Sequence, residues 1–277
     1  MNISLGGFGY IRNLNDILSN GFNYAELDMP EIEQLSENDF FALRDGCLEQ
    51  KLSVYVGVRV LPVIVPIIFS GKFSVSAWRP YLEKTFRRAS QLGIKKCVFG
   101  NGKARSLSDG NNIESRENFI LLMRMMSEIS GENGMELLLE PLGPKYSNFI
   151  NTLPQAFEYA ERVNLDNFNI MADIRHMVGS NDPFSNLINC AGRLHHVHLD
   201  YPLSYPKRPF PTLVDDYDYT GFFHNLIASG YEDTLTVEAD LPQDWGTALK
   251  ETLKLLNAHG IYAGGNPNLN LQSKSKH

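Results

Sequence analysis

Four residues with metal-ligand side chains each end a short apolar run in the second half of the chain. The runs are 135–140, 168–173, 194–198 and 234–238, and they end on Glu140, Asp173, His198 and Glu238. Three carboxylates cannot stay ionised in one small volume unless a cation compensates them. Three oxygen-bearing ligands and one imidazole favour Mn²⁺, Co²⁺ or Mg²⁺, with Zn²⁺ as a further candidate. The pattern therefore predicts one divalent metal ion held by four separate elements.

Taken singly, each of these residues has a simpler interpretation, because a strand-end carboxylate is commonly a loop cap or a surface charge. Four of them in register favour a shared site. The other nearby histidines are less defined. Alternation along a strand places His196 on the face of His198 and His195 on the opposite face, so His196 is expected to be a buried, hydrogen-bonded neighbour. His176, three residues after Asp173, either faces the cavity from the following loop or is structural.

The elements that must position these residues follow a repeated order of helix, glycine and strand. The glycines are Gly21, Gly93, Gly134, Gly192 and Gly230, and the earlier strands are expected at 3–5, 24–27, 53–58 and 96–99. Helices are expected over 11–18, 36–50, 76–92, 119–129, 152–163, 182–191, 218–229 and 249–256. Strands that alternate with helices are parallel, and eight such units predict an α/β fold, a single (β/α)8 TIM barrel.

The predicted barrel occupies residues 1–262, and a polar tail occupies 263–277. In a closed barrel the C-terminal ends of all strands surround one mouth, which would bring the four candidate ligands together. An open doubly wound sheet is the main alternative. That fold expects a GxGxxG phosphate fingerprint early in the chain, and the segment 6–9, Gly-Gly-Phe-Gly, lacks that spacing.

Composition narrows the class of partner. The formal net charge of −7 argues against a general nucleic-acid surface, which needs excess lysine and arginine. The longest apolar stretch, 60–69, is interrupted by two prolines and is too short to span a bilayer. Three cysteines far apart in the sequence suit reduced thiols, and the N-terminal residues lack the pattern of a secretion signal. We expect a cytoplasmic protein with a small-molecule partner and neither a nucleic-acid nor a membrane partner.

Several motifs in this order resemble the sugar phosphate isomerase/epimerase family, the xylose isomerase-like TIM barrels that include the tagatose and psicose 3-epimerases. They are Phe99-Gly-Asn-Gly-Lys-Ala-Arg105, Glu140-Pro-Leu with Asn148-Phe-Ile-Asn151, Asp173-Ile-Arg-His176, His196-Val-His198 and Val237-Glu238. The resemblance covers nearly the whole chain. It implies one divalent metal on the four candidate ligands, Glu140 and Glu238 as the acid/base pair, and His176 in contact with substrate oxygens. Relatives often form dimers or tetramers, so a homo-oligomer is a further expectation.

The implied reaction makes physical sense for this set of residues. A proton next to a ketose carbonyl is poorly acidic, so the enzyme needs a Lewis acid for the developing enediolate. It also needs two carboxylates on opposite faces of that carbon, one to remove the proton and one to return it. The sequence therefore predicts a divalent-metal-dependent isomerase or epimerase that acts on a keto sugar or related polyol through a metal-bound enediolate.

Two departures from the family pattern bear on the substrate. Tyr146 stands where the epimerases have a second substrate-binding glutamate. The arginine that follows the strand-seven histidine is absent at its usual spacing, and Lys207 with Arg208 come later in a proline-rich loop. We expect the metal and proton chemistry to persist while the choice of substrate changes. The candidate rim residues, either binding a carboxylate or phosphate or simply solvated, are Arg105, Lys145, Lys207 and Arg208.

The loop 201–216 is longer than typical barrel connections and rich in aromatic residues and prolines, which predicts a lid or a subunit contact. Two other functions remain as alternatives. One is a catalytically altered metal-binding barrel that acts as a ligand sensor or partner protein. The other is an apurinic endonuclease-like phosphodiesterase, which uses more histidines and acids at other strand ends. Strands two and three offer only Glu26, Asp28 and Arg59 for that chemistry.

Overall fold

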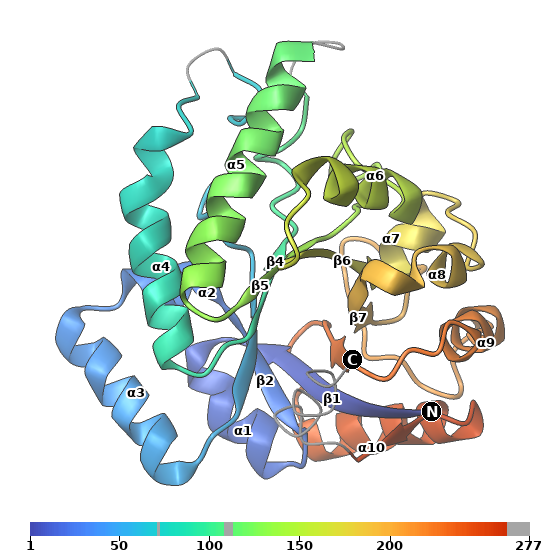
Figure 1. The fold of residues 1–277 in the computed structure, drawn as a ribbon. Coiled ribbons are helices and arrows are strands. Elements are labelled where there is room, and N and C mark those ends of the chain that lie inside the picture. The colour runs from blue at the N-terminus through green and yellow to red at the C-terminus, as the bar shows by residue number, and fades with distance from the viewer. Residues whose placement is uncertain (71–72, 108–112, 265–277) are drawn as a thin grey trace.

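The computed structural model describes residues 1–70, 73–107 and 113–264. Its eight parallel strands are β1 (Asn2–Gly9), β2 (Tyr24–Asp28), β3 (Val54–Val58), β4 (Lys96–Phe99), β5 (Glu136–Leu139), β6 (Phe168–Asp173), β7 (Leu194–Leu199) and β8 (Thr234–Val237). Each strand pairs with the next in sequence, and β1 pairs with both β8 and β2. The sheet is therefore a closed (β/α)8 barrel, as the alternating pattern predicts (Figure 1).

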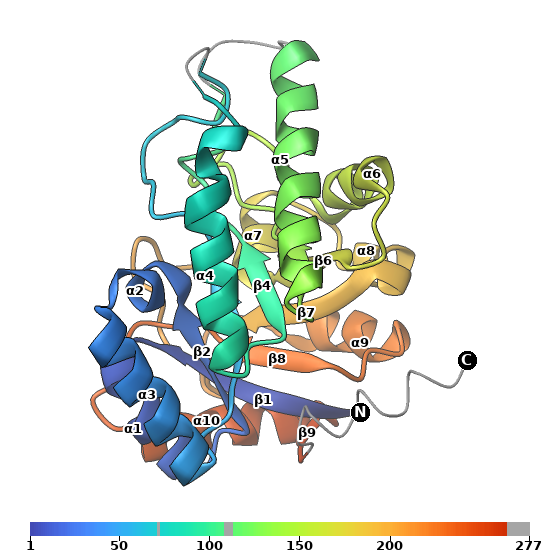
Figure 2. The ribbon, with the colours of Figure 1, turned by 60° about the vertical axis from the view of Figure 1, so that its left-hand side comes forward.

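Helices surround this barrel on the outside (Figures 1 and 2). They are α1 (Leu14–Ser19), α2 (Met29–Gln34), α3 (Glu37–Gln50), α4 (Arg79–Gln91), α5 (Ile113–Glu132), α6 (Leu153–Val163), α7 (Ile174–Gly179), α8 (Asn186–Asn189), α9 (Thr220–Ala228) and α10 (Trp245–Ala258). Short 3-10 turns occur at η1 (Ile11–Asn13), η2 (Ser76–Trp78) and η3 (Ala191–Arg193). A further strand of two residues, β9 (Tyr262–Ala263), pairs with the start of β1.

Two helices and one helix end differ from the sequence-based expectation. The short helices α2 and α7 follow β2 and β6 directly, and each is capped by the last residue of its strand, Asp28 or Asp173. Gly192 was expected to end a helix over 182–191. It lies instead within η3, and the regular helix there is only α8. The other four predicted glycines all have positive φ, which suits the ends of helices.

The barrel interior is filled by side chains that alternate along the strands. Tyr24, Val56, Val98, Leu138 and Met171 form an apolar cluster there. The Tyr24 ring lies across β1, where a Cβ on residue 6 would stand 2.2 Å from it, so this position requires glycine. Alternation then carries polar residues above this cluster, toward the C-terminal mouth, and below it, toward the N-terminal end.

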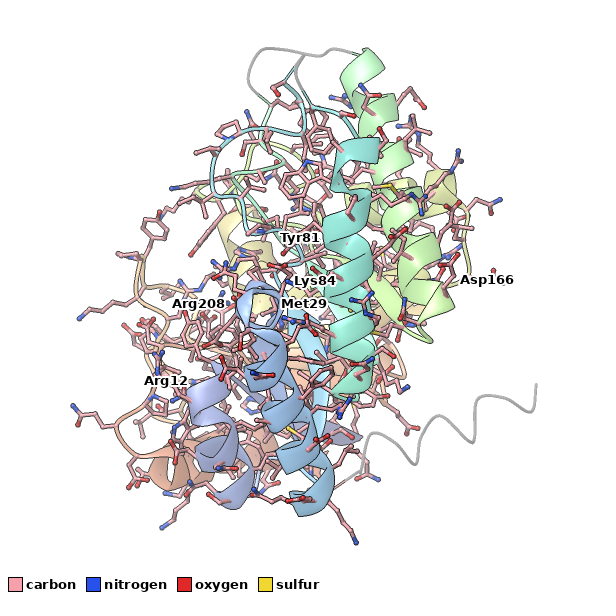
Figure 3. All side chains as sticks on the ribbon, turned by 90° about the vertical axis from the view of Figure 1, so that its left-hand side faces the viewer. Arg12, Met29, Tyr81, Lys84, Asp166 and Arg208 are labelled. Carbon is pink, nitrogen blue, oxygen red and sulfur yellow. The ribbon has the colours of Figure 1, made fainter. Side chains whose placement is uncertain are left out.

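A second and larger apolar layer lies between the strands and the helices. On one flank α2 packs on α4, where Lys84 donates to Glu33 at 2.8 Å and the Tyr81 hydroxyl donates to the Val60 carbonyl at 3.1 Å (Figure 3).

No helix in the described part of the chain is long and apolar enough to cross a membrane. The predicted polar tail falls almost entirely in 265–277, outside the described residues.

Candidate metal centre

The four predicted ligands meet at the C-terminal mouth of the barrel. Each continues the inward-facing register of its strand, so that Glu140 follows Leu138 and Glu238 follows Thr236 at intervals of two. One ligand atom from each of Glu140, Asp173, His198 and Glu238 lies within 4.8 Å of all the others. Nδ1 of His198 lies 3.5 Å from Oε1 of Glu140, 3.9 Å from Oδ2 of Asp173 and 3.1 Å from Oε2 of Glu238.

These residues fit a divalent cation. Two atoms that each lie about 2.1 Å from one ion are at most about 4.2 Å apart, and the three distances from His198 fall within that limit. Nδ1 of His198 is buried without a hydrogen-bond partner among the described residues. A bound cation would satisfy this atom and would help to offset the charges of the three carboxylates that converge on one point.

His198 is oriented by a residue that the sequence analysis did not assign to the site. Its Nε2 lies 2.9 Å from Oε1 of Glu26, on β2, and Oε2 of the same carboxylate lies 3.1 Å from Nε2 of His196. All three side chains are fully buried. Burial opposes ionisation of Glu26, but the two imidazoles outweigh it and hold the pKa of that carboxyl well below its usual value. His196 is thus the buried, hydrogen-bonded neighbour that strand alternation predicts.

Arg208 lies inside the centre rather than on its rim. Its Nη2 is 2.7 Å from Oδ2 of Asp173, its Nη1 is 2.5 Å from Oε2 of Glu238, and its Nε is 2.8 Å from Oδ2 of Asp200. Burial opposes the charge, but these carboxylates raise the pKa of Arg208 well above its usual value. The unusual spacing after His198 therefore does not remove the arginine from the site, because the loop 201–216 folds back and returns one.

A second arginine fixes that loop, and the sequence analysis did not identify it. Arg175, in α7, donates from Nε to Asp200 at 2.6 Å and from Nη2 to the Tyr201 carbonyl at 2.7 Å. It also donates to the Ser204 carbonyl. Its backbone N–H donates to Oδ1 of Asp173 at 2.7 Å. One helix start therefore carries a candidate metal ligand and the anchor of the loop above it.

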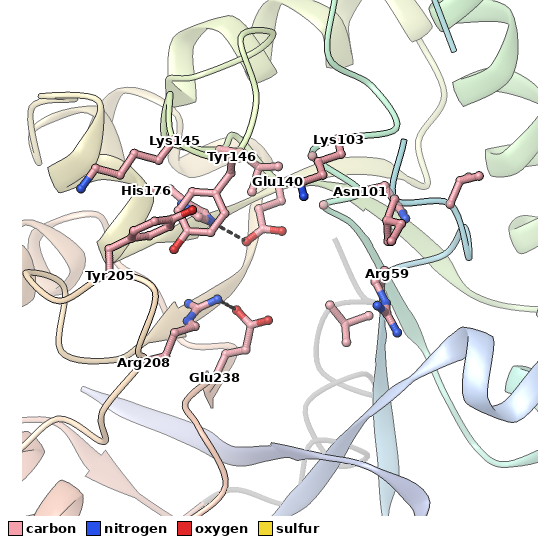
Figure 4. Close-up of a pocket in the computed structure, with 16 residues that line it drawn as sticks. Arg59, Asn101, Lys103, Glu140, Lys145, Tyr146, His176, Tyr205, Arg208 and Glu238 are labelled. Atoms are coloured by element: carbon pink, nitrogen blue, oxygen red, sulfur yellow. Dashed lines mark ion pairs between the residues drawn. The ribbon is translucent and has the colours of Figure 1, made fainter. Parts of the chain in front are cut away.

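The centre opens into a cavity of about 300 Å³. The cavity lining includes Glu140, Arg208 and Glu238 from the centre itself. It also includes Arg59, Lys103, Lys145, Tyr146, His176 and Tyr205. Figure 4 shows Tyr146, His176 and Tyr205 on one side of the two glutamates and Arg59, Asn101 and Lys103 on the other. The cavity is large enough for a monosaccharide-sized ligand.

His176 and Tyr146 form the wall nearest the metal ligands. His176 belongs to α7 rather than to a loop, and its Nε2 lies 3.6 Å from Oε1 of Glu140 and 3.7 Å from Oδ2 of Asp173. Its buried Nδ1 has no hydrogen-bond partner among the described residues. Burial lowers the pKa of His176 in spite of the nearby carboxylates. Tyr146 packs edge-on to this ring, with centroids 4.7 Å apart.

The other three basic residues predicted for the rim lie in different places. Lys145 lines the cavity, with its Nζ 5.0 Å from the centroid of the Tyr205 ring. Lys207 is exposed and stands outside the cavity lining. Arg105 does not belong to a rim: it is fully buried, and its Nη2 donates to the Glu140 carbonyl at 2.6 Å. Burial lowers the pKa of Arg105 to about 10, and its contacts make it a support for the strand end that carries Glu140.

The opposite wall was not anticipated. Arg59, just after β3, donates from Nε to Oδ1 of Asp28 at 2.7 Å and still lines the cavity. Lys103 lines it as well, and among the described residues no carboxylate oxygen lies within 4.0 Å of its Nζ or that of Lys145. Lys103 falls within the Phe99–Arg105 motif, which was the available signal for this wall.

Together, the closed barrel and this centre define a (β/α)8 protein with a buried candidate metal site at its C-terminal mouth. The sequence profile of the xylose isomerase-like TIM barrel family matches residues 16–259. The chain belongs to that family, as its motifs indicate. No protein of curated function matches the sequence.

Solved structures with a similar fold include three sugar epimerases. D-Allulose 3-epimerase from Methylomonas sp. in complex with D-allulose is 17% identical, with a TM-score of 0.78 over 93% of this chain and 97% of that one. L-Ribulose 3-epimerase is 19% identical, with a TM-score of 0.75 over 92% and 93%. The 3-keto-D-glucoside 4-epimerase from E. coli is 19% identical, with a TM-score of 0.72 over 92% and 99%. At identities this low, the structural similarity establishes a common fold and nothing more.

Proposed function

We propose that this protein is a divalent-metal-dependent isomerase or epimerase that moves a proton next to the carbonyl of a keto sugar or related polyol. The observation that carries the proposal is the convergence of Glu140 and Glu238, from strands β5 and β8, on one buried centre that opens into a sugar-sized cavity. The similarity of the fold to three sugar epimerases supports the same class of reaction.

The metal ligands would be Glu140, Asp173, His198 and Glu238. A divalent ion in that position supplies a Lewis acid, which makes a carbon-bound proton next to a carbonyl easier to remove. Mn²⁺, Co²⁺ and Mg²⁺ are the candidates that suit three carboxylates and one imidazole best, and Zn²⁺ is a further candidate.

Glu238 and Glu140 would exchange the proton. Glu238 is buried, which opposes its ionisation, but Arg208 and His198 outweigh burial and lower the pKa of its carboxyl. It is therefore an ionised carboxylate near neutral pH, in the form required of a base. Glu140 enters the cavity from a different strand, so a sugar held between them presents one face of its carbon to each carboxylate.

The surrounding residues would position the sugar. His176 lines the cavity, and its Nε2, which lies beside both Glu140 and Asp173, can bind a hydroxyl of the substrate. Tyr146 adds an aromatic face and a phenol at the position where epimerases of this family have an acid. This exchange of a carboxylate for a phenol makes the wall less negative, and Lys145 and Lys103 at the cavity edge favour a sugar with an anionic substituent.

The test is solvent-proton exchange on a panel of ketoses with and without a phosphate or carboxylate group. The Mn²⁺-loaded protein in D₂O is expected to place deuterium next to the carbonyl of one member of the panel, as read by NMR. Glu140→Gln and Glu238→Gln should lower the exchange rate by about 10²-fold or more, the contribution of a positioned acid or base. Full exchange in either variant would remove that residue from the proposed pair.

A second candidate function is a sensor or partner protein that keeps the ion without turning over a sugar. Tyr146 favours it, because an acid that holds the substrate in the epimerases is replaced. The same experiment separates the two functions. A sensor would bind one of the ketoses, as seen by calorimetry, and would leave its carbon-bound protons unexchanged after prolonged incubation in D₂O.

A further inference from the structure

A continuous line of hydrogen bonds runs through the barrel interior beneath the metal centre. It begins at Lys96 on β4, near the N-terminal end of the barrel, where Nζ lies 3.1 Å from Oγ1 of Thr234. The Thr234 hydroxyl lies 2.8 Å from Nδ1 of His196, and Nε2 of His196 lies 3.1 Å from Oε2 of Glu26. The other oxygen of Glu26 lies 2.9 Å from Nε2 of His198, which completes the line.

The direction of every hydrogen bond in this line follows from its first member. A lysine ammonium has three donors and no acceptor. Lys96 directs them at the His195 carbonyl at 2.5 Å, Oδ1 of Asp233 at 2.6 Å and Oγ1 of Thr234. Thr234 therefore accepts from Lys96, and its own proton goes to Nδ1 of His196 at 2.8 Å, which is a nearer acceptor than the His195 carbonyl at 3.5 Å.

The remaining protons are then assigned in turn. His196 accepts at Nδ1, so its proton is on Nε2 and is donated to Glu26. An ionised carboxylate only accepts, so His198 must also donate to Glu26 from Nε2. The neutral His198 ring then has a lone pair on Nδ1, and that atom faces oxygens of Glu140 and Glu238 at 3.5 and 3.1 Å. A bound cation relieves this meeting of lone pairs, as would a second proton on the ring.

We propose that Glu26 is a positioning residue for the metal centre: with the direction set by Lys96 through Thr234 and His196, it holds His198 in the Nε2–H tautomer and so presents Nδ1 to the ion. The carboxylate contacts neither the cavity nor the ion site directly. It acts through the imidazole, fixing the ring plane and adding negative charge behind the ligand.

The lower end of the line is a separate set of paired charges. Lys96 is buried, and it lies 2.6 Å from Asp233 and 3.7 Å from Glu136. Glu136 in turn contacts Nδ1 of His195 at 2.7 Å. The polar groups beneath the apolar cluster are thus paired with one another, and Glu26 is left to accept from the two histidines above and beside it.

The experiment is a metal titration of the full-length, metal-stripped protein by calorimetry with Mn²⁺. Glu26→Gln keeps the shape of the side chain but replaces one accepting oxygen with a donating NH₂, so it cannot accept from both imidazoles. Its Kd for Mn²⁺ should rise about 10- to 100-fold, the effect of losing such an outer partner of a ligand. Co²⁺ titration gives a second readout, because a displaced imidazole changes the visible absorption of the bound ion.

The matched control is Val98→Ala. Val98 lies on β4 two residues after Lys96, belongs to the apolar cluster of the barrel interior and is fully buried. Its side chain has no polar atom and therefore takes no part in the line from Lys96 to His198. Val98→Ala leaves a cavity and should lower thermal stability, while the Kd for Mn²⁺ stays within about twofold of wild type. An equal loss of affinity in both variants would overturn the proposal, because the effect would then be general to the barrel interior.

A measurement on the unmutated protein covers the case in which Glu26→Gln does not fold. In the Zn²⁺-loaded protein, ¹⁵N NMR should find His198 protonated on Nε2 and bound to the ion through Nδ1. Ligation through Nε2 would overturn the proposal. The inference rests on the metal centre of the proposed function but not on its reaction, since no substrate is present. If wild type binds no ion, both fall; if Glu26→Gln binds as wild type does, only the inference falls.

Discussion

The Glu140 carboxylate reaches the centre across a residue that has no side chain. A Cβ on Gly100, which directly follows β4, would stand 2.2 Å from Oε2 of Glu140. The backbone of Gly100 does not have a positive φ, so an alanine there is sterically acceptable to the main chain. The conflict is confined to the end of a flexible side chain, which can move away at little cost to the fold.

Gly100→Ala should therefore damage the metal centre selectively. We expect the displaced carboxylate to weaken Mn²⁺ binding about tenfold or more, by analogy with the loss of other groups that orient a ligand, with the stability of the metal-free protein nearly unchanged. Calorimetric titration and a urea unfolding curve measure the two effects. Gly46→Ala is the control, because no atom lies within 4 Å of a Cβ added there. Wild-type affinity in Gly100→Ala would show that Glu140 binds the ion from another rotamer.

The candidate ligands of this centre are easier to predict from the sequence than the residues that support them. Glu140, Asp173, His198 and Glu238 could be found because each ends an apolar strand, a position that barrel geometry turns into proximity. Glu26 could not be found in that way, since it lies within a strand and its partner is 172 residues distant. The sequence feature that indicated Glu26 is that it is the one charged residue in an otherwise apolar segment, 24–27, at an inward-facing position.

At the scale of elements, the loop 201–216 connects the metal ligands to the cavity wall. It supplies Arg208 to Asp173 and Glu238, and it supplies Tyr205 to the cavity. Arg175 binds its backbone at Tyr201 and Ser204, so the loop is fastened to α7. The lid or subunit contact that the length and composition of this loop predict stays a prediction. The position of Arg208 in it could not be read from spacing, because a loop can fold back toward the strand that it follows.

Removal of the Arg208 charge should make the protein more dependent on its ion. In Arg208→Met, three carboxylates lose a partner, and breaking such a buried pair costs about 3–5 kcal/mol of stability. A divalent ion restores part of that charge balance. We expect Mn²⁺ to raise the melting temperature of Arg208→Met by more than it raises that of wild type, as measured by differential scanning calorimetry.

Lys207→Met is the matched control for this prediction. It removes the same formal charge from the neighbouring residue, which is exposed and absent from the cavity lining. The melting temperature of this variant and its response to Mn²⁺ should equal those of wild type. Equal responses in Arg208→Met and wild type would mean that the Arg208 guanidinium does not neutralise the same carboxylates as the ion.

Tyr205 provides a test of the loop as a wall of the substrate site. Its ring packs against Tyr146, with centroids 5.5 Å apart, and faces Lys145. Tyr205→Ala should raise KM for the substrate about tenfold, the order expected when an aromatic contact of 1–2 kcal/mol is lost. The Kd for Mn²⁺ should stay at the wild-type value, because Tyr205 contacts no ligand. A change in Kd without a change in KM would reject this role.

At the scale of the whole molecule, the two ends of the barrel contain different groups of polar residues. The C-terminal mouth gathers the candidate chemistry, and the N-terminal end holds a paired polar cluster of Lys96, Glu136, His195 and Asp233. The barrel itself could be predicted because strands and helices alternate eight times, with a glycine before the strand in five of the units. The helices α2 and α7 could not, since each is six residues long and begins at a capping aspartate rather than at an apolar stripe.

The polar cluster at the N-terminal end should appear in the pH dependence of stability. Burial raises the pKa of Glu136, but the hydrogen bond from His195 and the charge of Lys96 outweigh it, so the folded-state pKa is lower than usual. A carboxyl with a lowered folded-state pKa stabilises the fold above its unfolded pKa, and that contribution is lost as pH falls through the folded value.

Glu136→Gln should therefore be less stable than wild type at pH 7 by about 1–3 kcal/mol, the range for a hydrogen bond to a charged group. The difference should shrink as pH falls below the ordinary pKa of glutamate, because the unfolded wild-type chain then takes up a proton on Glu136 that the folded protein does not, which favours unfolding. Urea unfolding at pH 7 and pH 4 measures both values, and the Kd for Mn²⁺ at pH 7 should be unchanged. A difference that stays constant with pH would mean that Glu136 stabilises the barrel through packing alone.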